Sequence, residues 1–119
     1  MTHPMTVDEV RRQMDVWWRD TDSAAIAAKD SQRTTLALLA LVRGMEPEER
    51  AMADVVIGEW LLSTEERKGF DALAVIDEIG MQSAVSKLRL LRSQLVAKRD
   101  PRAPFELEKV RRLLARLDP

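Results

Sequence analysis

The segment from Ser63 to Leu95 constrains the fold most, because it reads as two amphipathic helices joined at Gly80. Before Gly80, one side of the expected helix carries residues at helical spacing: Phe70, Leu73, Ala74, Asp77. After Gly80, a narrow apolar stripe follows: Val85, Leu88, Leu91, Leu95. Glycine adopts the left-handed backbone angles that commonly end a helix. The pattern therefore predicts a helical hairpin over this segment.

The rest of the chain also follows helical spacing, and no stretch alternates apolar and polar residues with a period of two. We therefore expect an all-α fold without strands, built from about five to seven short antiparallel helices. These would form HEAT-like hairpins or an irregular bundle. The 119 residues are expected to make a single domain, 1–119, with a proline-containing linker, 98–104, before the last helix.

Several polar residues mark expected helix boundaries. Thr6 and Ser63 are each followed three residues later by glutamate, which predicts capping boxes. Asp20–Ser23 is expected to break the first helix, and residues 24–43 form either one helix or two broken at Asp30-Ser31. The apolar run 36–42 is expected to be buried nearly all round. Further boundaries are expected at a set of glycine, proline and serine residues: Gly44, Pro47, Ser83.

In the Ser63–Leu95 segment, small and large apolar residues lie at regular spacing on both sides of one glycine turn: Ala72, Ile76, Ile79-Gly80, Ala84-Val85, Leu88. At this spacing the segment resembles one HEAT-type repeat of the phycobilisome-lyase-like kind. It departs from that pattern at Lys68-Gly69, where the repeat usually has a Val-Arg pair. The resemblance implies an α–α superhelical arrangement and a binding role, and it assigns no functional residue.

The composition narrows the class of protein. Hydrophobic residues make up 45% and charged residues 33%, as expected of a globular chain. There is no cysteine, which excludes disulfides and thiolate metal sites. The start carries no signal-peptide pattern, and the longest apolar run is far shorter than the roughly 20 residues that cross a bilayer. We expect a soluble, cytoplasmic protein.

Nothing in the sequence points to catalysis. His3 is the only histidine, and no nucleophile–base spacing or glycine-rich phosphate loop accompanies it. The carboxylates gather mainly where helices begin, and there they complement the positive end of the helix dipole. We therefore expect neither an enzyme nor a bound cofactor or metal ion.

Charge is divided unevenly along the chain. Residues 1–80 carry 16 Asp/Glu and 9 Lys/Arg, whereas residues 81–119 carry 4 and 10. The acidic side suggests partner-binding residues around the fourth expected helix: Glu65, Glu66, Asp71, Asp77, Glu78. Asp77 is singled out because the spacing places it on the apolar face. It is held in a structural pair with an Arg or Lys of a later helix, hydrogen-bonded to a helix N-terminus, or placed at the mouth of a partner-binding groove.

Trp17 and Trp18 are adjacent, so they point about 100° apart on a helix. Both cannot be fully buried on one face. We expect one to lie in the core and the other at its rim, where an exposed tryptophan is a frequent interface anchor. Self-assembly through this face is one possibility.

Two function hypotheses follow. The first is a small helical module that binds another protein; one form of it is an immunity- or antitoxin-type inhibitor whose acidic surface covers a basic toxin. The second is a nucleic-acid-associated protein that uses basic residues near the C-terminus: Arg92, Lys98, Arg99, Arg102, Arg111, Arg112. The second would show steeply salt-dependent binding to mixed DNA or RNA.

Overall fold

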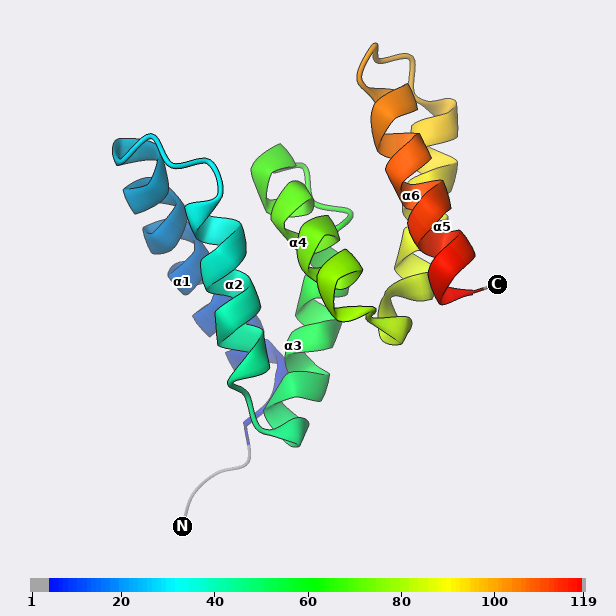
Figure 1. Ribbon diagram of the computed structural model, residues 1–119. Coiled ribbons are helices and arrows are strands. Elements are labelled where there is room, and N and C mark those ends of the chain that lie inside the picture. Colours follow the sequence, from blue (N-terminus) through cyan, green and yellow to red (C-terminus); the bar gives the residue numbers. More distant parts are fainter. Residues whose placement is uncertain (1–4, 119) are drawn as a thin grey trace. The chain divides into compact units, whose positions relative to one another are not determined.

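The structure is a computed structural model that describes residues 5–118, and in that range it holds six α-helices, one short 3₁₀ helix and no strand (Figure 1). The elements are α1 (Val7–Ala27), α2 (Arg33–Arg43), α3 (Pro47–Trp60), α4 (Glu66–Ile79), the 3₁₀ helix η1 (Gln82–Ala84), α5 (Val85–Ala97) and α6 (Ala103–Leu117). The predicted all-α class is confirmed. Among the described residues, no helix is both long enough and apolar enough to cross a membrane.

The chain forms two compact units, Met1–Val56 and Ile57–Pro119. The first contains α1, α2 and most of α3, and the second contains the end of α3 together with α4, α5 and α6. The boundary therefore lies within a helix and not in a loop.

Helix α1 begins as its cap predicts and runs further than expected. The Thr6 hydroxyl accepts a hydrogen bond from the Glu9 amide at 3.2 Å. The helix then continues through Asp20–Ser23, where a break was predicted. That prediction was wrong because Asp22 is buried and accepts a hydrogen bond from the Thr34 hydroxyl of α2 at 3.1 Å. A side chain engaged by another helix does not compete for its own backbone.

The break between the first two helices lies close to Asp30-Ser31, so residues 24–43 belong to two helices. Lys29 has the positive φ of 55° that turns the chain, and the Asp30 carboxylate accepts a hydrogen bond from the Gln32 amide at 3.2 Å. Helix α2 packs against α1, and its Leu38 and Val42 are fully buried.

The expectation that the run 36–42 is buried nearly all round was wrong, since Leu36 is 60% exposed. The helix that contains it ends at Gly44, as predicted. Helix α3 starts at Pro47 with two acids in its first turn, also as predicted.

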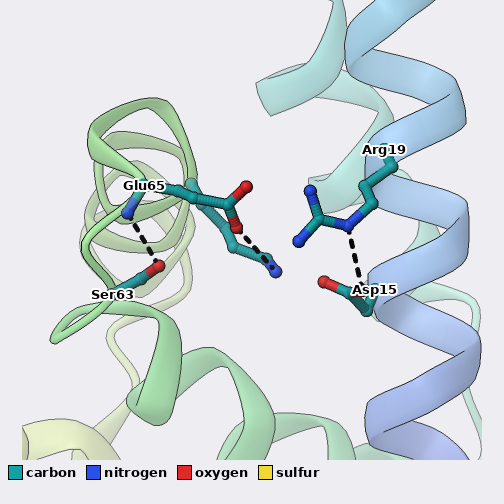
Figure 2. A network of polar contacts seen from close by, with 5 residues as sticks. Asp15, Arg19, Ser63 and Glu65 are labelled. Carbon is teal, nitrogen blue, oxygen red and sulfur yellow. Dashed lines mark hydrogen bonds and ion pairs between the residues drawn. The ribbon is translucent and has the colours of Figure 1, made fainter.

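The start of α4 differs from the predicted capping box. The Ser63 hydroxyl accepts a hydrogen bond from the amide of Glu65, not from that of Glu66, at 3.1 Å (Figure 2). Ser63 thus closes a turn before the helix, and Glu65 is the N-cap residue. Lys68 is buried with its ammonium 4.8 Å from the centre of the Trp60 ring and 3.4 Å from the Glu65 carboxylate. This cluster ties the start of α4 to the end of α3.

Helix α4 ends at Gly80, whose φ of 73° is left-handed as predicted. The Gly80 amide donates to the Ile76 carbonyl at 2.9 Å. Four residues of the HEAT-type pattern are buried, namely Ala72, Ile76, Ala84 and Leu88, while Ile79 and Val85 beside the turn are partly exposed.

Helix α5 packs most closely against α6, to which it is antiparallel (Figure 1). The short helix η1 precedes α5, so Ser83 lies inside it and does not cap α5. Helix α6 starts at Ala103 with Pro104 in its first turn, which leaves a shorter connection than the predicted 98–104. The Asp100 carboxylate accepts a hydrogen bond from the Arg102 amide there, at 2.9 Å.

Replacing the two glycines that follow helices tests the turn at Gly80. Gly80→Ala should lower the free energy of unfolding by about 1 kcal/mol, because alanine is strained at positive φ. An added Cβ would meet nothing nearer than the Leu117 side chain at 3.9 Å, so the cost is conformational. Gly44→Ala is the control, since its φ of −85° suits alanine. Urea unfolding followed by circular dichroism measures both, and equal costs would contradict the assignment.

Candidate functional site

Helices α4 and α6 run in the same direction, with α5 antiparallel between them along the chain (Figure 1). Ion pairs join them near both ends. Arg102, the N-cap of α6, lies 3.5 Å from the Glu66 carboxylate at the start of α4. Arg116 lies 2.6 Å from the Asp77 carboxylate in the last turn of α4, and it also donates to the Asp77 backbone carbonyl. The two helices are thus linked by one ion pair near each end.

A groove of about 580 Å³ lies between these helices. We call it the α4–α6 groove, and its lining is Phe70, Leu73, Ala74, Asp77, Lys109, Arg112, Leu113 and Arg116. The α4 wall is mostly apolar, and the α6 wall adds the buried Leu113 below three cations. The groove thus has an apolar floor and one basic edge.

The three cations of this edge differ in their engagement. Arg112 is paired with Glu108 of its own helix at 3.1 Å, and Arg116 is paired with Asp77. Lys109 makes no hydrogen bond or ion pair within residues 5–118. Asp77 is the one carboxylate among the lining residues.

A second hollow of about 480 Å³ adjoins the groove toward the start of α4 and the end of α5. Phe70 and Leu73 line both spaces, so the two side chains form the ridge between them. Polar residues from the α5–α6 connection, including Lys98 and Asp100, close the second hollow.

The two phenylalanines of the chain are both exposed, Phe70 by 43% and Phe105 by 75%. Phe105 lies outside the groove lining, on the face of α6 that carries Lys109, Arg112 and Arg116 at helical spacing. Large apolar side chains exposed beside a hollow are typical of a surface that binds another molecule.

Asp77 was expected on the apolar face of this helix, and its side chain is 59% exposed. Phe70, Leu73 and Ala74 do share its side of α4, but that side lines the groove. The buried face of α4 is instead Lys68, Asp71, Ala72, Val75 and Ile76. Asp77 is paired with Arg116 of the later helix α6 and also lines the groove, so its partner-binding role stays a prediction.

The other acidic candidates divide between the core and the surface. Glu65 is paired with Lys68, and Glu66 with Arg102. Asp71 is buried, with only 7% of it exposed, so a partner could not reach it without rearrangement. Glu78 is exposed near the end of α4. The structure therefore brings Glu66 and Asp77 to the α4–α6 boundary and leaves Asp71 inside.

The tryptophans follow the sequence-based expectation: Trp18 is in the core and Trp17 is half-buried. Trp17 lines a shallow, open hollow on one face of α1, together with Glu9, Arg12 and Val16. These residues belong to the first unit and are not part of the α4–α6 groove.

The basic candidates do not form one surface of free charges. Arg92 and Arg111 are exposed on α5 and α6, and Lys98 and Arg99 lie between those helices. Lys98, Arg102 and Arg112 face carboxylates, namely Asp100, Glu66 and Glu108. Arg112 is the one member of this set that lines the α4–α6 groove. Two ion pairs, Glu66 with Arg102 and Asp77 with Arg116, link the acidic residues 1–80 to the basic residues 81–119.

Within the described residues, no group of three or more His, Cys, Asp or Glu side chains is arranged to hold a metal ion. His3 lies outside the described residues. Neither a protein-family model, nor a curated protein, nor a solved structure matches this chain.

Substitutions at Phe70 and Ile76 separate surface from core on α4. Phe70→Ala should cost about 1 kcal/mol of unfolding free energy or less, because much of the ring already contacts water. Ile76→Ala should cost about 2–5 kcal/mol, since it empties a fully buried site. Chemical denaturation of both variants checks this. A Phe70 cost as large as that of Ile76 would mean that the ring belongs to the core.

The pair between Asp77 and Arg116 is accessible to solvent, so it should contribute little to stability. A double-mutant cycle of Asp77→Ala and Arg116→Ala should give a coupling energy of at most about 1 kcal/mol, reduced further by salt. Arg116→Ala should be the more costly single change, because this arginine also donates to the Asp77 carbonyl. A coupling of several kcal/mol that resists salt would contradict this exposed geometry.

Proposed function

We propose that the protein is a helical protein-binding module that receives a helical segment of a partner in the α4–α6 groove. The observation that carries the proposal is Phe70, a large apolar side chain exposed on the ridge between two hollows. From Phe70 to Asp77, the α4 wall spans about two helical turns. A groove of this kind suits the apolar stripe of an amphipathic helix, which inserts side chains at helical spacing.

A nucleic-acid-associated protein is the other candidate, and the geometry favours it less. Binding to a nucleic-acid backbone uses cations gathered on one surface. Here the basic candidates are spread over several elements, since Arg92 is on α5, Arg111 is on α6, and Lys98 and Arg99 lie between these helices. A groove with an apolar floor also offers phosphate groups little.

An immunity- or antitoxin-type inhibitor would be one form of such a module, and its inhibitory action stays a prediction. The form in which acidic residues cover a basic toxin gains little support from the charges of α4. Glu65 and Glu66 are engaged by cations of the same unit, and Asp71 is buried. We therefore base the proposal on the groove and not on the acidic residues.

Selection from a displayed library of amphipathic helical peptides tests the proposal. The library keeps a leucine stripe and randomises the flanking positions between Glu and Lys. The wild-type protein should enrich a set of peptides that Phe70→Ser fails to retain, because the substitution removes the apolar ridge. Val96→Ser is the control, since Val96 is similarly exposed on α5 but lines neither hollow. Enrichment that is absent, or unchanged by Phe70→Ser, would refute a binding role for the groove.

A further inference from the structure

The positive charge of the groove lies on its α6 wall only, and this asymmetry bears on which ligand the groove binds. Its α6 wall presents Lys109, Arg112 and Arg116, whereas its α4 wall presents the single carboxylate of Asp77. The three cations follow one another at spacings of three and four, so they form one row along α6. The apolar lining residues are Phe70, Leu73 and Ala74 on α4 and Leu113 on α6.

We infer that the segment bound in the groove is an acidic amphipathic helix, with its apolar stripe on Phe70, Leu73 and Leu113 and its carboxylates against the cations of α6. This inference rests on the proposed function and specifies its partner. Charge complementarity carries it, because like charges placed opposite this row would be repelled.

The cations can receive new carboxylates without breaking a buried network. Lys109 has no partner within the described residues. Arg112 and Arg116 are paired, but both pairs are largely exposed, with side-chain exposures of 78% and 56% for the two arginines. Exposed ion pairs are weak, so a bound carboxylate can share or replace Glu108 and Asp77.

Asp77 has a specific place in this arrangement. As the one carboxylate in the lining, it repels an acidic ligand and at the same time occupies Arg116. Removing its charge should therefore strengthen binding. A residue that only maintained the shape of the groove would weaken binding when it is replaced, so the direction of the change is diagnostic.

Two synthetic peptides of about four helical turns test the inference. They share one leucine stripe and differ only in flanking positions that are all Glu or all Lys, and binding is measured by fluorescence anisotropy at low and moderate salt. The Glu peptide should bind the wild-type protein at least about tenfold more tightly, and the difference should shrink as salt screens the charges.

Variants then assign the effect to the row on α6. Lys109→Glu/Arg112→Glu should weaken the Glu peptide by about tenfold or more and strengthen the Lys peptide. Arg92→Glu/Arg111→Glu is the matched control, because it changes the net charge equally at two exposed positions outside the groove lining. Asp77→Asn should tighten the Glu peptide by a few-fold.

Each other outcome has a defined meaning. Equal or tighter binding of the Lys peptide, or equal loss in the groove and control variants, overturns the inference. In either of these cases, the inference of an acidic ligand fails. If Phe70→Ser nevertheless abolishes binding of both peptides, the proposal that the groove binds a helical segment stands. Binding of neither peptide also overturns the inference. A labelled duplex DNA that binds more tightly than the Glu peptide, and loses binding in the groove variant, would replace it with the nucleic-acid reading.

Discussion

The left-handed turn at Gly80 is the constraint on which the second unit depends. It ends α4 and allows the chain to reverse through η1 into α5. A second reversal after α5 returns α6 in the direction of α4. Only with this parallel course can Glu66 meet Arg102 at one end while Asp77 meets Arg116 at the other. The groove lies between α4 and α6, which are linked by one ion pair near each end, and side chains of both helices line it.

Local signals in the sequence predicted most of the helices. Thr6 marks a boundary through its side-chain hydroxyl, and Pro47 and Gly80 mark boundaries through their backbone conformation; the structure has helix ends at all three. Asp20–Ser23 misled because its composition favours a break, while the buried hydrogen bond from Thr34 to Asp22 favours continuity. Such a bond joins residues on two helices, and local propensity does not contain that information.

The site was only partly predictable, because α4 carries two apolar stripes. Phe70 and Leu73 define one, and Val75 and Ile76 define the other. The large apolar residues of the first stripe favoured its assignment to the core. The second stripe is the buried one, but it also contains Lys68 and Asp71, whose charges argued against burial. The row of Lys109, Arg112 and Arg116 could have been read from its helical spacing, with Phe105 on the same face as a further signal. That this row faces α4 depends on tertiary packing, which spacing does not encode.

The boundary between the two units falls between Val56 and Ile57, near the end of α3, and both residues are fully buried. A gene fragment that ends there would sever a hydrogen-bonded helix and give each half a frayed, apolar end. Such halves are poor material for recombination, since an exchangeable segment normally begins and ends in an exposed loop.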